Sequence, residues 1–454
     1  MTTSFLPSPG SIAAMPAHDL RASVVAGKMT ARDVAEALLG RIAEVDANIR
    51  AFAWHDPPHV LAQADALDAW QRAGRTLGPL HAVPVALKDI IDTKGIPTEY
   101  GSAVGRGNIP GANAAVVERL HAAGAIVIGK TVTTELAFMH PGPTRNPLNV
   151  KHTPGGSSSG SAAAVAAGMV PLAVGTQTGG SVTRPASYCG IVGFKPSFGR
   201  ISRRGVLPQS QSLDTVGVFA RDPRDAAMLV EVLAGHDPAD CATMGFERPL
   251  LAIADEGPGP KGLVLALVRL PGVSEVHYAQ LRDSLSHLPA DKVNVIECEL
   301  PDTFSQIAEL RELINFAEMA HHYAWVQARG AGAVSDVLRA AMEKGQAISA
   351  TRYMSAVADM AEARKLLSNS FRGFDAILST ATAGPAPEGL ESTGTAICNG
   401  LWTYLGAASA NLPMGVATFE GLRHGLQVTG PSGNDAQVLR VTQQLYGMTK
   451  AFVP

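Results

Sequence analysis

Short apolar runs alternate with helical patterns through the first half of this chain. A helical pattern occupies residues 116–123, between two of the apolar runs. Strands covered on both faces carry apolar side chains throughout their length, so these runs predict buried strands. The alternation indicates an α/β layer structure with a central sheet. The predicted strands are 83–87, 125–128, 171–174 and 191–194.

The remaining stretches are richer in helical patterns. About the first 75 residues are predicted to be helical, and Thr30 with Asp33 has the spacing of a capping box before an amphipathic run. Helical patterns also dominate residues 302–372. Gly-Pro turns within 220–262 mark the best candidate for an internal boundary. Strands are expected to return at 263–268, 374–379 and 425–429.

The composition predicts a folded protein with a large buried interior. Apolar residues make up 46% of the 454 residues and charged residues 17%, which argues against disorder. The net charge of -3, without a basic run, lacks the footprint of a nucleic-acid binder, so we expect no nucleic acid among the partners. The longest apolar stretch, 162–175, is too short to cross a bilayer of about 30 Å, and no membrane partner is expected. The first twenty residues lack the pattern of a secretory signal, which predicts a cytoplasmic protein.

The cysteines give no sign of disulfides or a metal site. They are widely scattered and form no CxxC pair. We therefore expect four buried thiols, at Cys189, Cys241, Cys298 and Cys398.

Two clusters of serine and glycine are the densest chemical signals. They occupy residues 154–161 and 175–181. Paired glycines before a serine permit backbone angles closed to other residues and leave main-chain N–H groups uncovered, as an oxyanion hole requires. A plain tight turn between strands would explain the second cluster equally well. A serine nucleophile also needs a base, because its hydroxyl is weakly nucleophilic at neutral pH.

Lys88 is the candidate base. None of the thirteen histidines has an obvious relation to either cluster. Lys88 follows the apolar run 83–87, and at a buried strand end desolvation lowers the pKa of an ammonium group towards the range of a useful base. An ion pair of Lys88 with Asp89 or Asp92 is the structural alternative.

Residues 78–222 resemble the amidase signature family. The similar stretches occur in the family's order, and a weaker similarity follows at 411–415 and 421–427. Together they cover nearly the whole chain. The stretches are GPLHAVPVALKDIIDTKG (78–95), AAGAIVIGKT (122–131), PGGSSSGSAAAVAAG (154–168), GTQTGGSVTRPASYCGIVGFKPSFGRIS (175–202) and SLDTVGVFARD (212–222).

The resemblance implies the fold of the family, a mixed central β-sheet flanked by helices. It also implies a single domain over residues 1–454. The expected parts are an N-terminal helical part (about 1–75), a signature core (about 76–222), a variable, largely helical region (about 230–370) and a closing part (about 371–454).

By the same resemblance, three residues are catalytic. Lys88 is the base, Ser157, after a cis peptide bond, is the proton relay, and Ser181 is the nucleophile. Neutral Lys88 would draw a proton through Ser157 from Ser181, whose attack on an amide carbonyl gives an acyl-enzyme that water hydrolyses. No metal or organic cofactor is expected. The implied oxyanion donors are the backbone N–H groups of Thr178, Gly179, Gly180 and Ser181.

Some positions depart from the family's pattern. Gln177 stands where an acidic residue is common, and Thr183 where an arginine is common, with Arg184 one position later. Ser159 replaces a usual glycine, which resembles branches that cleave urea carboxylates. The hydrogen bonds that support the site are therefore expected to differ from the usual ones.

The substrate pocket is weakly encoded. The resemblance implies that a small-molecule amide contacts Phe138, Met139, His140, Ser158 and Trp402. Simple packing is the alternative explanation, because Phe138 and Met139 suit a core and His140, beside a proline, suits a loop.

The predicted function is hydrolysis of a linear carboxamide by a free-standing enzyme, for which a symmetric homodimer would be an ordinary assembly. Two alternatives share the fold. One is the glutaminase (A-type) subunit of a tRNA-dependent amidotransferase, which passes ammonia to a partner, and the other is a hydrolase of ureido or allophanate-type substrates. Gln177 and Thr183 favour the free-standing enzyme.

Two further hypotheses require a different site. Residues 156–160 fit the G-x-S-x-G nucleophile elbow, with Asp375 and His424 following in the order of α/β-hydrolases, but the polar, proline-broken approach at 149–154 provides no strand. A non-catalytic phosphate loop at 175–181 would need a lysine where Gly180 stands.

Overall fold

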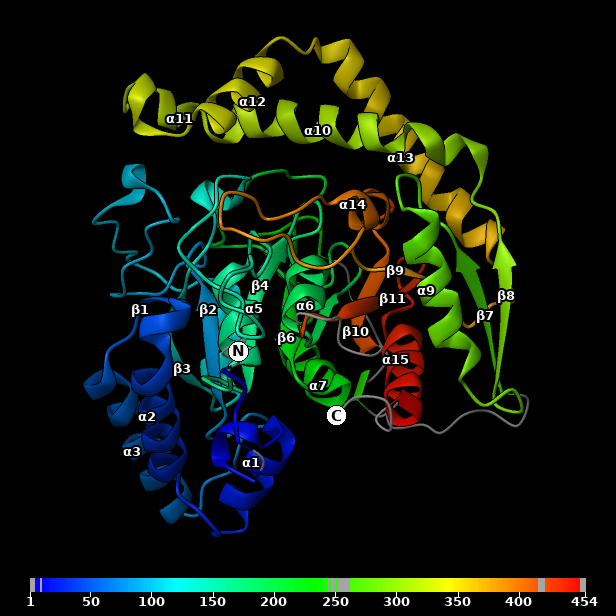
Figure 1. Ribbon diagram of the computed structural model, residues 1–454. Coiled ribbons are helices and arrows are strands. Elements are labelled where there is room, and N and C mark those ends of the chain that lie inside the picture. Colours follow the sequence, from blue (N-terminus) through cyan, green and yellow to red (C-terminus); the bar gives the residue numbers. More distant parts are fainter. Residues whose placement is uncertain are drawn as a thin grey trace.

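The protein folds around a mixed sheet with helices on both faces, as the sequence predicts (Figure 1). The structure is a computed structural model that describes residues 5–8, 10–243, 245, 250–251, 262–414 and 421–449. Within the predicted boundary segment 220–262, residues 244, 246–249 and 252–261 lie outside the described residues, as does Gly415.

The described strands form one 11-stranded sheet in the order β1-β3-β2-β4-β6-β5-β10-β11-β9-β7-β8. Pairing is parallel between β2 and its neighbours β3 and β4 and between β7 and its neighbours β8 and β9, and antiparallel elsewhere. This continuity supports the single-domain organisation, which stays a prediction. The strands are β1 (Phe52–Trp54), β2 (Pro84–Lys88), β3 (Ile126–Thr131), β4 (Leu172–Gln177), β5 (Val192–Lys195), β6 (Thr215–Ala220), β7 (Leu263–Val268), β8 (Val293–Cys298), β9 (Ala376–Thr380), β10 (Ala408–Met414) and β11 (His424–Gly430).

The helices cover the sheet and, at residues 307–370, one end of it. Short 3₁₀ helices lie at Ile12–Ala14, Ala103–Gly105, Glu135–Ala137, Asp302–Gln306 and Ala331–Ala333. The α-helices are α1 (Ala17–Val25), α2 (Ala31–Ile49), α3 (Pro57–Arg72), α4 (Ala115–Ala122), α5 (Ser159–Ala166), α6 (Thr183–Cys189), α7 (Pro223–Leu233), α9 (Glu275–Ser286), α10 (Ile307–His322), α11 (Ala324–Gln327), α12 (Asp336–Gln346), α13 (Ala350–Ser370), α14 (Ile397–Tyr404) and α15 (Asp435–Thr449).

Alternate residues of the buried strands enter two apolar cores. Val85 and Leu87 of β2 pack into a core shared with α4, α7 and α15, whereas Ala86 packs into a second core with α2 and α5. Both faces of β2 are therefore dry, which explains its continuous apolar sequence. The last residue of β2 is Lys88, so the strand carries this side chain into the interior.

The local signals in the sequence were reliable. The capping box at the start of α2 forms as predicted, with Thr30 Oγ1 accepting from the Asp33 N–H and the Asp33 carboxylate accepting from the Thr30 N–H. The six predicted strands that end by residue 379 fall on β2, β3, β4, β5, β7 and β9, and the seventh falls on β11. The prediction missed four strands: the short β1, inside the N-terminal helical part, and β6, β8 and β10.

Helices α10 to α13 form a layer that crosses one end of the sheet (Figure 1). This layer corresponds to the predicted helical region 302–372. Its helix α10 packs against α14 and reaches the loop that follows β4, because Arg311 of α10 lies beside Gly179. The layer therefore covers the end of the sheet at which β2 and β4 terminate.

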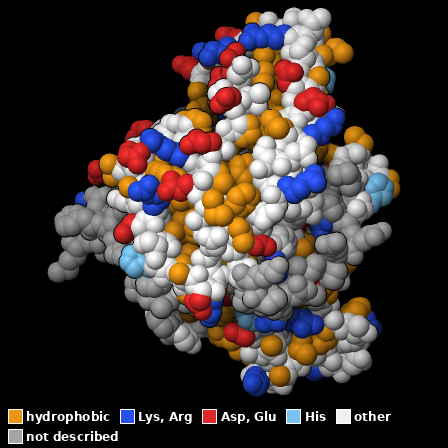
Figure 2. All heavy atoms as spheres, turned by 90° about the vertical axis from the view of Figure 1, so that its right-hand side faces the viewer, with side chains coloured by type: hydrophobic (Ala, Val, Ile, Leu, Met, Phe, Trp, Pro, Cys, Tyr) orange, Lys and Arg blue, Asp and Glu red, His pale blue; other side chains and the backbone are white. Residues whose placement is uncertain are grey.

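At the far side of the molecule the sheet ends at β8. Figure 2 looks onto the side where β7, β8 and α9 lie, and hydrophobic side chains gather in the middle of this face among charged ones. Ile296 of β8 is 41% exposed. The β8 edge is thus an open edge strand with an apolar residue in it.

The cysteines are unpaired, but they are not uniformly buried. Cys189 and Cys398 are buried, Cys298 is partly exposed and Cys241 is exposed, so the expectation of four buried thiols is wrong for Cys298 and Cys241. Within the described residues no helix is long and apolar enough to span a bilayer. The same residues contain no group of three or more His, Cys, Asp or Glu side chains suited to a metal ion.

Candidate active site

Lys88 lies at the carboxyl end of β2, between the neighbouring strands β3 and β4. Its side chain is completely buried. Lys88 Nζ is hydrogen-bonded to Ser157 Oγ at 2.7 Å and to Thr176 Oγ1 at 2.8 Å. Burial lowers the pKa of Lys88 to about 7, and the more distant negative charge of Asp214 opposes this shift. The alternative ion pair with Asp89 does not form, since Asp89 lies 3.5 Å from Lys130 instead.

Ser157 lies in the loop that leads into α5. The peptide bond between Gly156 and Ser157 is cis, where the resemblance led us to expect one. The Ser157 carbonyl accepts from the Thr134 N–H at 3.2 Å, and the next residue, Ser158, is hydrogen-bonded to the backbone of Thr176. These contacts hold the first serine cluster against the end of β4, with Ser157 beside Lys88.

The second cluster forms the turn between β4 and α6. Within the described part of the chain, the N–H groups of Gly179, Gly180 and Ser181 have no hydrogen-bond acceptor, and the Ser181 hydroxyl has no partner. A Cβ at Gly180 would lie 2.5 Å from Asn399 Oδ1, so only glycine fits there. The turn therefore presents three free N–H groups and one free hydroxyl within the three residues 179–181.

Gln177 braces this turn from inside. Its Oε1 accepts from the N–H groups of Val182 and Thr183 at 2.8 and 3.0 Å, and from Thr183 Oγ1 at 3.2 Å. Its Nε2 donates to Thr403 Oγ1 at 3.0 Å, and Thr403 Oγ1 donates to the Gly179 carbonyl at 2.7 Å. A carboxylate at position 177 could accept but not donate, so the amide links both ends of the turn to α14.

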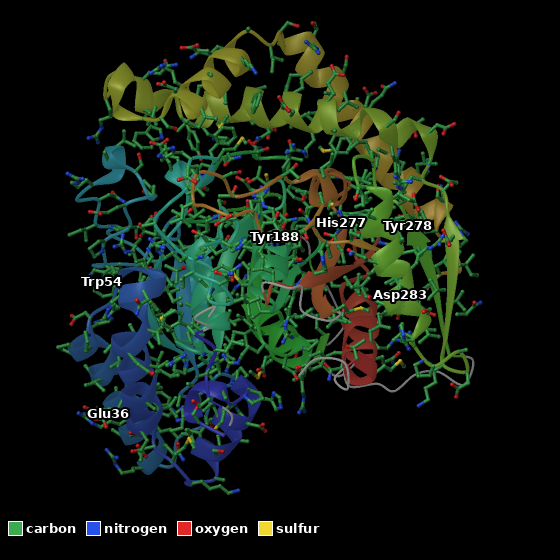
Figure 3. The ribbon with its side chains drawn as sticks, viewed as in Figure 1. Glu36, Trp54, Tyr188, His277, Tyr278 and Asp283 are labelled. Carbon is green, nitrogen blue, oxygen red and sulfur yellow. The ribbon has the colours of Figure 1, made fainter. Side chains whose placement is uncertain are left out.

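Arg184 ties the two clusters together. Its Nη2 donates to the Gly156 carbonyl at 2.6 Å and its Nη1 to the Gly394 carbonyl at 2.9 Å. Tyr188, one turn further along α6, lies near the middle of the molecule (Figure 3) and is 3% exposed. A Cβ at Gly155 would lie 2.9 Å from the Tyr188 ring. Helix α6 thus packs closely against the loop that carries Ser157.

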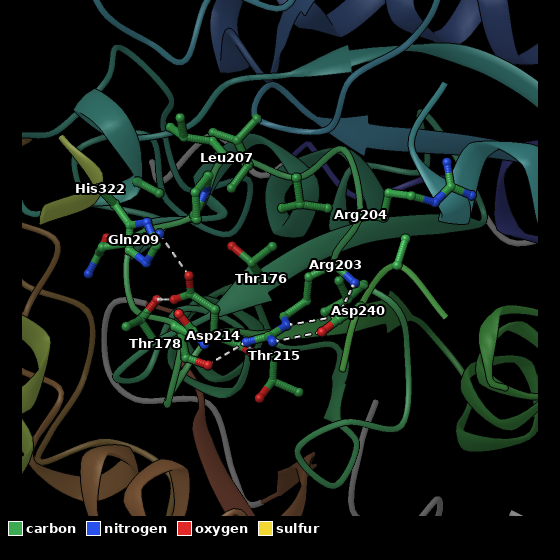
Figure 4. Close-up of a pocket in the computed structure, with 17 residues that line it drawn as sticks. Thr176, Thr178, Arg203, Arg204, Leu207, Gln209, Asp214, Thr215, Asp240 and His322 are labelled. Atoms are coloured by element: carbon green, nitrogen blue, oxygen red, sulfur yellow. Dashed lines mark hydrogen bonds and ion pairs between the residues drawn. The ribbon is translucent and has the colours of Figure 1, made fainter. Parts of the chain in front are cut away.

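A cavity of about 230 Å³ borders the site (Figure 4). Thr176 and Thr178 line it, together with Asp214, whose Oδ1 accepts from Thr178 Oγ1 at 2.5 Å. Neither Ser157 nor Ser181 is among its lining residues. The cavity therefore reaches the groups that support Lys88 and the turn, and not the hydroxyls themselves.

The structure divides the predicted substrate-binding residues into two groups. Ser158 and Trp402 are completely buried, in the serine cluster and in the main core, so neither offers surface to a substrate and this expectation is corrected. Phe138 packs edge-on against Phe316 of α10, with 6.2 Å between ring centroids. Met139 is 56% exposed and His140 is also exposed.

The nucleophile-elbow hypothesis fails on geometry. Asp375 accepts from Gln437 Nε2 at 2.8 Å and from Arg440 at 3.4 Å, and it also accepts from the Val264 N–H. The His424 ring packs against His277. Among the described residues, no hydrogen bond joins Asp375, His424 and Ser158.

Sequence reasoning missed four residues of the site: Thr176, Asp214, Arg311 and Thr403. Thr176 and Asp214 stand inside stretches that resemble the family, so their positions carried a signal. Nothing in the sequence connects Arg311 or Thr403 with residues 178–181, because more than a hundred residues separate them.

The chain is similar to known proteins over nearly its whole length. The family model described as Amidase matches residues 33–439. The A-type subunit of the glutamyl-tRNA(Gln) amidotransferase of Symbiobacterium thermophilum is 35% identical, over 94% of this chain and 95% of that protein. The native peptide amidase of Stenotrophomonas maltophilia has a TM-score of 0.84 and 29% identity, over 99% of both chains. An inhibitor-bound complex that revealed the origins of an s-triazine catabolic enzyme has a TM-score of 0.88 and 26% identity, over 96% of this chain and 99% of that one.

These similarities overturn the expectation that excluded nucleic acid. Several curated relatives are subunits of an amidotransferase named for glutamyl-tRNA(Gln). The net charge of -3 was a poor guide because it describes this chain's own surface.

Proposed function

Since this chain belongs to the amidase family, we propose that it hydrolyses a carboxamide C–N bond with Ser181 as nucleophile, Ser157 as proton relay and Lys88 as base. The environment of Lys88 carries this proposal. The Lys88 amine is buried against two hydroxyl groups, and its pKa is lowered to about 7. A large fraction of the lysine is therefore neutral at neutral pH and can accept a proton.

In the first half-reaction, Lys88 accepts the Ser157 proton while Ser157 accepts the Ser181 proton. Ser181 Oγ then attacks the amide carbonyl carbon. This requires Ser181 Oγ to come within hydrogen-bond reach of Ser157 when substrate binds, since such contacts often tighten only in the complex. Return of the proton to the leaving nitrogen breaks the C–N bond and leaves an ester on Ser181. Water, activated by the same relay, hydrolyses that ester to a carboxylate.

The free N–H groups of the turn suit the oxyanion of this reaction. We assign the oxyanion hole to the backbone of Thr178, Gly179, Gly180 and Ser181. Losing one such donor typically costs about 10²- to 10³-fold in kcat, so a fixed turn matters to the rate. The hydrogen bonds that Gln177 and Thr403 make support this assignment because they restrain the turn at both ends.

For the physiological amide we propose glutamine, with the chain acting as the ammonia-releasing subunit of an assembly like that of its curated relatives. The similarity that supports this covers 94% of the chain at 35% identity. A free-standing amidase for small amides is the second candidate. It is supported by the likeness to a peptide amidase and by the departures at Gln177 and Thr183.

Ammonia or amine release from glutamine and a panel of aliphatic, aromatic and ureido amides tests these proposals. We expect Ser181→Ala and Lys88→Ala to lose roughly 10³-fold or more of the activity. Lys94→Ala, which changes an exposed lysine six residues away, should keep it. Full activity in Lys88→Ala would place the base elsewhere. Co-purification with partner chains and a preference for glutamine would support the role in an assembly, and turnover of other amides by the isolated chain would support the free-standing enzyme.

A further inference from the structure

Arg311 lies beside the turn at residues 178–181 and has no hydrogen-bond or ion-pair partner among the described residues. Arg311 belongs to α10, and its guanidinium lies between Gly179 and Gly400. A Cβ at Gly179 would be 3.3 Å from Arg311 Nη1, and a Cβ at Gly400 would be 2.7 Å from Nε. Both neighbours are glycine, so the backbone leaves room for the guanidinium beside the turn.

Arg311 is enclosed, yet its guanidinium atoms keep access to solvent, because none is among the fully buried atoms that lack a hydrogen bond. Burial lowers its pKa, and the charge that opposes this shift belongs to the exposed neighbour Glu312. An arginine in such surroundings normally makes bidentate hydrogen bonds to a carboxylate. Here no described carboxylate fills that role.

A second arginine and the N-terminus of a helix add to the positive potential around Arg311. Burial lowers the pKa of Arg184, and the positive charge of Arg311 lowers it further, so the two guanidinium groups repel each other across the site. Helix α14 begins at Ile397, and the Cβ of the preceding residue, Ala396, would lie 3.6 Å from a Cβ at Gly179. The N-terminus of a helix carries a partial positive charge. The carboxylate of Asp214, which approaches the same turn, is already engaged by Thr178 and by the N–H groups of Gln209 and Ser210.

We infer that Arg311 binds a carboxylate of the substrate, so that the enzyme acts on amides whose acyl part carries a second, free carboxylate. This inference rests on the proposed amide hydrolysis and names its substrate class. Gly179 is two residues from Ser181, a span of at most about 7 Å. The carboxylate and the scissile carbonyl are therefore separated by a short spacer, as in ω-amides of four- and five-carbon dicarboxylic acids.

The experiment compares glutaramate with valeramide, which has the same chain length and lacks the carboxylate. Wild type should have a lower KM for glutaramate. Arg311→Ala should raise that KM by about 10- to 100-fold, the effect of losing hydrogen bonds to a charged group, and change the KM for valeramide by less than about threefold. Arg311→Lys should recover part of the loss. Arg352→Ala, which removes an exposed arginine that pairs with Glu309 on α10, is the matched control and should change neither.

A binding measurement separates this inference from the hydrolysis proposal. Calorimetry with glutaramate on Ser181→Ala and on Ser181→Ala/Arg311→Ala needs no turnover. Binding that weakens at least tenfold in the double variant supports the carboxylate site, even if the reaction is not the proposed one. Equal binding by the two variants, or equal use of glutaramate and valeramide by wild type, overturns the Arg311 assignment while Ser181-dependent hydrolysis would still stand.

Discussion

Gln177 and Thr183 are hydrogen-bonded to each other, with 3.2 Å between Oε1 and Oγ1, inside the turn that carries Ser181. These are two of the positions at which the sequence departs from the family's usual pattern. In the structure they form one arrangement, since Gln177 Oε1 also accepts from the Thr183 N–H. The two departures therefore belong together, and a change at one position should be felt at the other.

Gln177→Leu should lower kcat by about 10- to 100-fold, because the turn loses the amide that joins its two ends while its own donors remain. KM and the pH midpoint should stay unchanged, because Gln177 neither contacts substrate nor titrates. Steady-state kinetics checks this. Thr183→Ser keeps the hydroxyl and should remain within about twofold of wild type. A Gln177→Leu enzyme with wild-type kcat would show that the turn holds its shape without the brace.

The pH profile should report the titration of Lys88. The neutral amine is the active form, so kcat/KM should be low at acid pH, rise through a midpoint near pH 7 and level off above it. The negative charge of Asp214 raises the pKa of Lys88. Asp214→Asn removes that charge and should move the midpoint to lower pH, while the amide oxygen can still accept from Thr178.

Asp240→Asn is the control for this shift. Asp240 lines the same cavity, but its carboxylate pairs with Arg203 at 2.9 Å (Figure 4). Its removal should leave the midpoint unchanged. A midpoint that moves upward in Asp214→Asn, or a flat profile in wild type between pH 6 and 9, would contradict the assignment of Lys88 as base.

Gly180→Ala should abolish most activity without unfolding the protein. The added methyl group would lie 2.5 Å from Asn399 Oδ1 and must displace the turn. Asn399→Ala on top of Gly180→Ala removes the obstructing amide and should restore part of kcat. Circular dichroism and kinetics of both variants decide the matter. If the double variant is no faster than Gly180→Ala, the methyl group acts by blocking substrate and not by moving the donors.

Stability should rise with pH above neutrality because buried lysines fold in their neutral form. Lys195 of β5 is completely buried, donates to the carbonyls of Pro196 and Ala407, and has its pKa lowered to about 7. Between this value and the ordinary lysine pKa, the unfolded chain binds one proton more than the folded chain. The free energy of unfolding therefore rises as pH rises through this range. Below pH 7 the lysine is protonated in both the folded and the unfolded state, so Lys195 adds no pH dependence to the stability there.

Lys195→Met should therefore reduce the slope of unfolding free energy against pH by about 1.4 kcal/mol per pH unit between pH 8 and 9.5. Urea denaturation at three pH values measures the slope. Lys94→Met, at an exposed position, should leave it unchanged. An unaltered slope in Lys195→Met would mean that this lysine stays protonated in the fold.

Local sequence patterns predicted much of the fold. The boundaries of β7 coincide with the predicted run 263–268, because a buried parallel strand is apolar throughout. In contrast, β10 contains Pro413, and proline argues against a central strand. Pairing of β10 with β5 ends at Asn411, so Pro413 lies beyond the part of the strand that is paired on both sides.

The residues of the candidate site also differ in how well the sequence predicts them. Lys88 could be predicted to be buried because its strand is apolar, and its pKa follows from that burial. Arg311 and Thr403 could not, because they meet the turn at residues 178–181 only through the packing of α10 and α14. The exclusion of nucleic acid rested on the net charge of one chain, and this charge could not show that the chain is similar to subunits of an amidotransferase named for a tRNA.

Under the two proposals above, substrate choice and bond cleavage are encoded in different stretches of the gene, because the helical layer over the sheet supplies Arg311. The residues that we assign to the chemistry lie on β2, on the loop before α5 and on the turn after β4, whereas Arg311 and Phe316 belong to α10. Point mutations within residues 307–370 can therefore redirect the enzyme to new amides while the proton path stays intact. Such a layout lets the substrate range change during evolution while the catalytic residues stay the same.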